Sequence, residues 1–475
     1  MSTERFRAVL PEERYAAFDQ TMWLARELLD GRVVWNINST AHGGGVVELL
    51  GPLLAYARGT GVDGRWLVIE GPPEFFTVTK RIHNRLHGMP GDGLPLDDQA
   101  RRIYEDTLAA NADEVVQRIR PGDVVIIHDP QPAGLLPEIR AQGASVIWRC
   151  HVGLDTPNEL ARDTWAFLLP YLRDADAYVF SRESFAWDGL DRDRIVVIPP
   201  TIDIFSPKNQ ELSPELVRHV LAAAGVVQGA GDPAAAVFKR QDGSPRRVER
   251  KAKLWQERPL ERDVPTVVQI SRWDALKDPL GVIRGFAEHV PADTGAHLLY
   301  AGPAVDAVQD DPEGARMLQE SIELYQQLPA EARARIHLAT LPMDDTEENA
   351  VMVNAIQRHS RVIVQKSLAE GFGLTVAEGM WKGRPVVASR IGGIQDQITD
   401  GKSGVLLDDP RDLAAFGVAL TELLTDPARA DRMGHCARER VRDKFLSVRS
   451  LLDYLAVIRK TLALTAASQE AAALP

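Results

Sequence analysis

The sequence has few cysteines, no long apolar run and no excess of basic residues. Only Cys150 and Cys436 occur in 475 residues, so neither a disulfide framework nor a clustered cysteine metal site is expected. No segment approaches the roughly 18 apolar residues of a membrane span, and the charged stretch 1–14 lacks the apolar centre of a signal peptide. The net charge of −12 disfavours a nucleic-acid partner, because phosphate binding needs a basic face. We therefore expect a soluble protein of the cytoplasm, with no nucleic-acid or membrane partner.

Short apolar runs alternate with amphipathic helical patterns along most of the chain. The apolar runs 32–37, 124–128 and 145–149, for example, are separated by helical patterns such as 46–58. This alternation is typical of an α/β fold with a doubly wound parallel sheet. A length of 475 residues predicts more than one such domain. Sheets of this kind bind ligands at the carboxyl ends of their strands, so polar residues just beyond the apolar runs become site candidates.

The pattern divides the chain into five segments. The predicted boundaries are an N-terminal extension 1–30, a first Rossmann-like domain 31–205, a linker or insert 206–262, a second Rossmann-like domain 263–445, and a C-terminal helix 446–475 that returns to the first domain. The extension could pack on its own domain or on another subunit. The insert carries the basic stretch 239–262 and is predicted to be a solvated linker or a lid.

A glycine-rich turn follows the apolar run 361–364. Gly371 and Gly373 let the backbone approach a ligand closely, and the helix that follows offers unpaired N–H groups to a phosphate or a sugar oxygen. Two carboxylates, Glu370 and Glu378, flank this helix start and could meet sugar hydroxyls. A structural alternative stays open, since Thr375-x-x-Glu378 is also a capping box and Glu378 could pair with Lys382.

A cationic pair follows the run 266–270. Arg272 and Lys277 lie five residues apart ahead of a helix, where a guanidinium fork and an ammonium can bind one diphosphate. Either could equally be a surface charge.

Polar strand-end residues also mark the first half of the chain. Asn38 to Gly45 join the first predicted strand to a helix, and the glycines there allow close backbone approach. The other candidates after strands are Asp129, Gln131, Arg149 and His151. His151 taken alone is more simply a core or capping histidine.

These motifs resemble a known family. The phrase EGFGLTVAE, which runs from Glu370 to Glu378, is similar to the Glu-x7-Glu motif of retaining GT-B glycosyltransferases of family 4. The stretch VNAIQRHSRVIVQKSLAEGFGLTVAEGMWKGRPVVAS and the phrase DGSPRRV resemble the trehalose glycosyltransferring synthase subgroup. The resemblance implies two Rossmann-like domains facing a central cleft, and transfer of α-glucosyl from NDP-glucose to glucose. It also implies retention at the anomeric carbon and a reversible reaction.

The resemblance also assigns roles to residues. Catalytic roles fall to Arg272, Lys277, Glu370 and His151. Donor binding falls to Gly44, Gly45, Gly371, Phe372, Gly373, Leu374, Thr375 and Glu378, and acceptor binding to Asn38, Asp129, Gln131 and Arg149. No metal or cofactor is implied beyond the sugar nucleotide as co-substrate, and a homodimer is compatible. The rival interpretations are a trehalose phosphorylase, another family-4 glucosyltransferase, and a non-catalytic nucleotide-sugar sensor.

Overall fold

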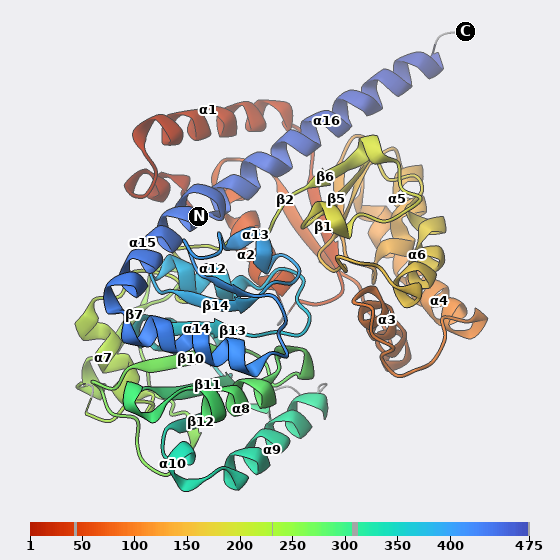
Figure 1. Ribbon diagram of the computed structural model, residues 1–475. Coiled ribbons are helices and arrows are strands. Elements are labelled where there is room, and N and C mark those ends of the chain that lie inside the picture. Colours follow the sequence, from red (N-terminus) through yellow and green to blue (C-terminus); the bar gives the residue numbers. More distant parts are fainter. Residues whose placement is uncertain (42–44, 230, 306–311, 474–475) are drawn as a thin grey trace. The chain divides into compact units, whose positions relative to one another are not determined.

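A computed structural model of the chain divides into two compact units (Figure 1). Unit 1 comprises Met1–Thr201 with Ser447–Pro475, and unit 2 comprises Ile202–Leu446. The structure describes residues 1–41, 45–229, 231–305 and 312–473. Each unit contains its own parallel sheet, as the alternating pattern predicts.

Unit 1 is built on a six-stranded sheet with the order β2-β1-β3-β4-β5-β6, all of it parallel. The strands are β1 (Val34–Asn38), β2 (Gly64–Val68), β3 (Val124–His128), β4 (Ser145–Cys150), β5 (Ala177–Phe180) and β6 (Ile195–Val197). The connecting helices are α2 (Gly45–Gly59), α3 (Pro73–Leu86), α4 (Asp98–Arg118), α5 (Leu136–Ala141) and α6 (Glu159–Leu172). The central strands β1, β3 and β4 are buried along their whole length, which explains their continuous apolar sequence.

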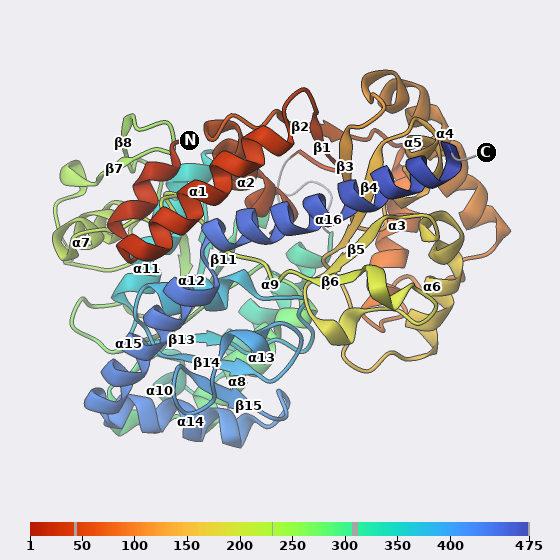
Figure 2. The same cartoon turned by 90° about the horizontal axis from the view of Figure 1, so that it is seen from above.

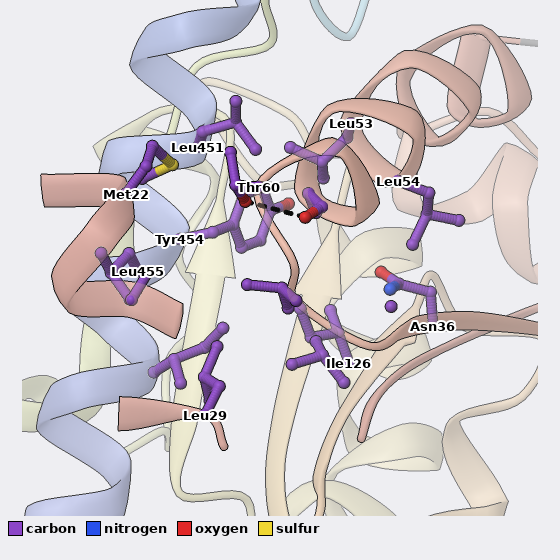
Figure 3. A pocket seen from close by; sticks show the side chains of 16 residues that line it. Met22, Leu29, Asn36, Leu53, Leu54, Thr60, Ile126, Leu451, Tyr454 and Leu455 are labelled. Carbon is purple, nitrogen blue, oxygen red and sulfur yellow. Dashed lines mark hydrogen bonds between the residues drawn. The ribbon is translucent and has the colours of Figure 1, made fainter. Parts of the chain in front are cut away.

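The N-terminal extension packs on unit 1. Its helix α1 (Glu12–Leu28) lies beside the last helix, α16 (Ser447–Ala473) (Figure 2). Met22 of α1 and Tyr454 of α16 line an apolar pocket with Leu53 of α2 and Ile126 of β3 (Figure 3). The extension and the returning helix therefore complete the core of this unit.

Unit 2 is built on a seven-stranded sheet with the order β15-β14-β13-β10-β11-β12-β9. The strands are β9 (Lys253–Trp255), β10 (Thr266–Ile270), β11 (His297–Pro303), β12 (Ile336–Leu341), β13 (Val362–Gln365), β14 (Val386–Ser389) and β15 (Val405–Leu407). The helices are α7 (Pro214–Ala223), α8 (Pro279–His289), α9 (Pro312–Gln327), α10 (Ala330–Arg333), α11 (Thr346–His359), α12 (Leu374–Trp381), α13 (Ile394–Gln397), α14 (Leu413–Thr425) and α15 (Pro427–Lys444). Only β9 pairs antiparallel among the strands described for this sheet.

The segment 206–262, expected to be a solvated linker or lid, is part of the body of unit 2. It supplies α7, the strand β9, and a hairpin of β7 (Val237–Lys239) and β8 (Pro245–Arg247). Two of its basic residues are held by acidic partners on and before α11: Arg240 pairs with Asp345 and Glu347, and Arg250 pairs with the buried Glu348. The sequence suggested solvation because it does not reveal the acidic partners about a hundred residues away.

No described helix combines the length and the apolar character that crossing a bilayer requires.

Candidate functional site

The cationic loop and the glycine-rich turn meet at the carboxyl ends of β10 and β13. Lys277 Nζ donates to Glu370 Oε2 over 2.5 Å, and the Oγ of Ser367 lies 3.4 Å from the same oxygen. The two charged side chains are mostly buried, with 15% and 13% exposed. The backbone N–H of Leu368 donates to the carbonyl of Leu276, which ties the two loops together. The expected convergence of a cation and a carboxylate from distant segments is thus present within unit 2.

A buried polar frame supports this pair. Gln269 of β10 donates from Nε2 to the carbonyl of Lys277 over 2.7 Å and accepts from the backbone N–H of Lys366 over 3.1 Å. The fully buried Lys366 ammonium forms an ion pair with Asp278. Asp278 also caps α8 by accepting from the N–H of Gly281. Both loops are therefore fixed by groups that solvent does not reach.

Arg272 belongs to the same loop but takes a more open position. More than half of its side chain is exposed, and its Nη2 pairs with Asp274 Oδ2 at 3.1 Å. Asp274 Oδ1 in turn accepts from the N–H of Leu276. The guanidinium is therefore anchored to the loop that carries Lys277 and is exposed to solvent.

The predicted glycine turn starts α12 as expected, and glycine is required at two points. Gly373 is the N-cap residue with a φ of 79°, and no side chain caps the helix. Gly392, with a φ of 45°, lies so close to the turn that an added Cβ would come within 1.8 Å of the carbonyl oxygen of Glu370. Its neighbour Gly393 donates to the carbonyl of Gly371 over 2.9 Å. The turn from Glu370 through Phe372, and the first helical residues Leu374 and Thr375, are thereby held in one conformation.

Glu378 is not the capping residue that the structural alternative requires. The helix begins after Gly373, and the buried carboxylate places Oε1 3.2 Å from Lys208 Nζ. The expected ion pair with Lys382 is also absent from the described contacts, because the Lys382 ammonium donates to Asn209 Oδ1 and to the backbone carbonyl of Glu378. Glu378 Oε2 is buried and has no hydrogen-bond partner in the described part of the chain. The capping-box interpretation is therefore wrong, and one carboxylate oxygen remains available for a ligand.

Two histidines stack at the carboxyl ends of neighbouring strands in unit 1. His128 ends β3, and His151 follows β4, with ring centroids 5.6 Å apart and planes inclined by 16°. His128 Nδ1 lies 3.3 Å from His151 Nε2, and its Nε2 lies 2.9 Å from Asn36 Oδ1. Burial, together with the nearby Arg149 charge, lowers the pKa of His128 to about 3 and that of His151 well below its usual value. Both rings are therefore neutral at physiological pH.

The expected acceptor residues lie around these histidines or on adjacent strands. Asp129, with a φ of 65°, accepts from the backbone N–H of His151 over 2.7 Å. Burial raises the pKa of its carboxyl group to about 6, against the lowering effects of that hydrogen bond and of Arg149. Arg149 is buried; its Nη2 donates to Ser181, whereas its Nε and Nη1 have no partner in the described segments. A buried guanidinium with two open donors is a binding group for a polar ligand or a water.

The remaining first-half candidates have simpler positions. Asn38 is buried and uses both side-chain ends internally, accepting from Trp66 Nε1 and donating to the carbonyl of Thr40. Gln131 is partly exposed in the loop after β3. Gly45 is the first residue of α2, and Gly44 lies outside the described residues.

Sequence reasoning missed four groups that the structure places next to the predicted site residues or next to their direct neighbours. Three support the second-half site, namely Gln269, Lys366 and Lys208, and the fourth is Asn36 beside His128. Gln269 and Asn36 are polar residues in the interior of largely apolar strands, and that is the signal that would have singled them out. Lys208 carries no such signal, since it lies in the segment taken for a linker.

Two family matches cover most of the chain. Residues 36–187 match the family described as trehalose synthase, N-terminal domain, and residues 253–440 match the glycosyl transferases group 1. The first match covers most of the sheet of unit 1, and the second covers the sheet of unit 2.

Relatives that match nearly the whole chain carry the same family name. The chain is 36% identical to the trehalose synthase of Rubrobacter xylanophilus, over 96% of each chain. It is 32% identical to the trehalose synthase of Pyrococcus horikoshii, over 96% of this chain and 95% of the relative. A solved E. coli structure, titled as trehalose-6-phosphate bound with UDP-2-fluoro glucose, superposes with a TM-score of 0.64. It covers 90% of this chain and 99% of its own at 15% identity, so it bears on the fold alone.

Proposed function

This chain belongs to the trehalose synthase family of GT-B glycosyltransferases, and we propose that it transfers glucose from NDP-glucose to free glucose. The product is α,α-trehalose, formed with retention at the donor carbon, and NDP is released in a reversible reaction. The observation that carries the proposal is the 2.5 Å contact of Lys277 with Glu370 beside the uncapped start of α12. Charged donors, a carboxylate and free helical N–H groups are what the diphosphate and the hexose of such a donor need.

Each donor group has a proposed partner. Arg272 and Lys277 bind the diphosphate, and Glu370 orients hydroxyls of the transferred glucose. Glu378 binds the nucleotide ribose through Oε2, a role that its lack of a protein partner supports. The backbone from Gly371 to Thr375 contacts the donor, with Phe372, Gly373 and Leu374 shaping that surface. Gly44 and Gly45 keep the donor-binding role that the family resemblance implies.

The proposed chemistry is a front-face displacement. The bond between the donor C1 and the diphosphate oxygen breaks, and the acceptor oxygen forms a bond to C1 on the same face. The acceptor hydroxyl proton passes to the departing phosphate oxygen, so no protein base is required. Attack on the face from which the diphosphate leaves gives retention without a protein nucleophile. Arg272 and Lys277 stabilise the charge that develops on the diphosphate, a contribution of about 10²- to 10³-fold in rate for one well-placed donor.

Sugar binding in unit 1 is assigned to His151 and its neighbours. His151 contacts a sugar hydroxyl, and Arg149 donates to the acceptor through nitrogens that have no described protein partner. Asp129 holds the His151 backbone, which supports a positioning role. Asn38 and Gln131 complete the proposed acceptor set.

Incubation with UDP-, ADP- or GDP-glucose plus glucose tests the proposed reaction. We expect one of the three donors to yield NDP and a non-reducing disaccharide that an α,α-trehalase cleaves. Trehalose plus NDP should regenerate NDP-glucose. Release of glucose 1-phosphate from trehalose and phosphate, without NDP dependence, would instead identify a phosphorylase. Nucleotide-sugar binding without any product would identify a sensor.

The other proposed properties are a cytoplasmic location and a homodimer. The free cysteines Cys150 and Cys436 support a reducing compartment. Trp23 and Leu24 on α1 are 60% and 52% exposed, which supports contact with a second copy of the chain. Light scattering of the wild type and of a Trp23→Lys variant tests the dimer, which only the wild type should form.

A further inference from the structure

A chain of hydrogen bonds runs from the sheet of unit 1 to His151. Asn36 pairs with Ile126 in the register between β1 and β3, and residues two apart share a face of a strand. The Asn36 amide therefore lies diagonally from His128, with Oδ1 2.9 Å from its Nε2 (Figure 3 shows the Asn36 amide). His128 Nδ1 then lies 3.3 Å from His151 Nε2. The chain thus runs from the Asn36 amide through the buried imidazole of His128 to the imidazole of His151.

The amide oxygen determines where the protons lie. Oδ1 rather than Nδ2 of Asn36 faces the ring, and a carbonyl oxygen can only accept, so in this orientation of the amide His128 carries its proton on Nε2. A neutral imidazole has one N–H, so His128 Nδ1 is an acceptor and His151 must donate from Nε2. His151 Nδ1 is then left unprotonated, and it has no partner among the contacts of the described residues. The depressed pKa of both rings excludes the doubly protonated form that would break this logic.

We propose that Asn36 and His128 are positioning residues that hold His151 in the Nε2–H tautomer, so that its Nδ1 accepts a hydrogen bond from a sugar hydroxyl. The identity of the ligand as a sugar rests on the proposed function, whereas the tautomer rests only on the hydrogen bonds. Asp129 fixes the backbone of His151 and the Asn36–His128 pair fixes its ring. The site therefore selects a hydroxyl that donates, rather than one that accepts.

A second histidine pair in unit 2 serves as a matched control. His297 Nδ1 lies 2.9 Å from His337 Nε2, and His337 Nδ1 lies 2.9 Å from Gln256 Oε1. The rings stack at 5.1 Å and 17°. His297 is the first residue of β11 and His337 is the second residue of β12, so both lie at the amino ends of their strands, whereas ligands bind at carboxyl ends. Gln256→Leu thus removes an equivalent amide without touching the site.

The first experiment is a ¹⁵N–¹H NMR measurement of histidine tautomers in the full-length chain, with His151 assigned by its loss in His151→Gln. We expect the Nε2–H form for His151 in the wild type and in Gln256→Leu. Asn36→Leu should give a mixture of tautomers, and Asn36→Gln, which keeps a neutral amide oxygen, should restore the single form. A wild-type Nδ1–H form overturns the inference even if every variant fails to fold. So does an unchanged tautomer in a folded Asn36→Leu.

The second experiment uses glucose acceptors in which one hydroxyl at a time is replaced by hydrogen or by fluorine. Fluorine cannot donate a hydrogen bond, so at one position both analogues should lose kcat/KM equally. Asn36→Leu should lower kcat/KM for glucose by about tenfold, as expected for one hydrogen bond. It should also remove the penalty for the analogues. Partial activity of the fluoro analogue at every sensitive position would show that His151 donates, which overturns the inference. A chain without transferase activity but with the Nε2–H tautomer would refute the proposed function and leave the hydrogen-bond chain intact.

Discussion

Lys277 Nζ and Glu370 Oε2 lie 2.5 Å apart although 93 residues separate them in the sequence. The ammonium and the carboxylate neutralise each other in a mostly buried place. Under the proposed function, the donor substrate competes for both groups. This competition makes the pair a sensitive target for substitution.

Lys277→Ala should lower kcat/KM by about 10²- to 10³-fold, because the variant lacks one donor to the leaving diphosphate. The melting temperature should change by only a few degrees, since the loop remains fixed by Gln269 and Lys366. Steady-state kinetics and calorimetry measure the two effects. Lys402→Ala, at an exposed lysine of the same unit, is the control. Wild-type turnover in Lys277→Ala would reject the assigned role.

Glu378→Gln should weaken NDP binding by about tenfold or more, as expected for a hydrogen bond to a charged group. Titration calorimetry with the nucleotide measures the dissociation constant. Glu348→Gln changes another buried carboxylate of unit 2, one that pairs with Arg250, and should cost stability without changing nucleotide affinity. If Glu378→Gln, like Glu348→Gln, loses stability but keeps its affinity for the nucleotide, Glu378 is only a structural residue.

Gly392→Ala should displace the turn at Glu370, because its Cβ would lie 1.8 Å from a carbonyl oxygen. We expect a loss of activity together with a lower melting temperature. Gly401→Ala is the matched control, since Gly401 also has a positive φ of 70° but open space around its Cα. That control should cost about 1 kcal/mol of backbone strain and leave activity intact. Equal effects of the two substitutions would show that strain, rather than the contact with the turn, explains the loss.

The free energy of unfolding should depend on His128 in mild acid. Its folded pKa of about 3 lies below the usual 6.5, so the unfolded chain binds a proton first as the pH falls. This stability contribution is complete above pH 6.5 and is lost towards pH 3, at about 1.4 kcal/mol per pH unit. Asp129, with a pKa of about 6, acts in the opposite sense: the folded state holds its proton between about pH 4 and 6.

Denaturant titrations of wild type and His128→Gln from pH 7 to pH 4 isolate the histidine contribution. The free energy of unfolding of His128→Gln should fall less steeply with decreasing pH, because about one proton fewer is taken up on unfolding. His435→Gln, at an exposed histidine, should follow the wild type. Parallel curves for wild type and His128→Gln would contradict the shifted pKa.

Removal of metal ions should leave the transferase reaction unchanged, because Arg272 and Lys277 supply the positive charge that the diphosphate requires. Assays after EDTA treatment and gel filtration, with and without added Mg²⁺, measure this. A loss of activity that Mg²⁺ restores would show that the two side chains are insufficient.

The sequence predicted the sheets and the glycine turn before α12 well, because both depend on local patterns. The apolar run 266–270 coincides with β10, and the glycine turn before Leu374 opens a helix as expected. The partners of those residues could not be predicted, since Lys208 and Asp274 carry charges typical of any surface. The hydrogen bond from His128 to the Asn36 amide oxygen depends on the pairing of β1 with β3, which no local pattern encodes.

The short strand β9 has a consequence for solubility. It covers the outer side of β12 with only three residues, one of them Lys253, and it runs against the direction of the sheet. A parallel sheet that ended at β12 would present a row of open backbone donors and acceptors to other chains, which invites aggregation. The short length of β9 and the charge of Lys253 disfavour pairing with a further strand. The segment 206–262 therefore protects the enzyme from association through this edge of the sheet.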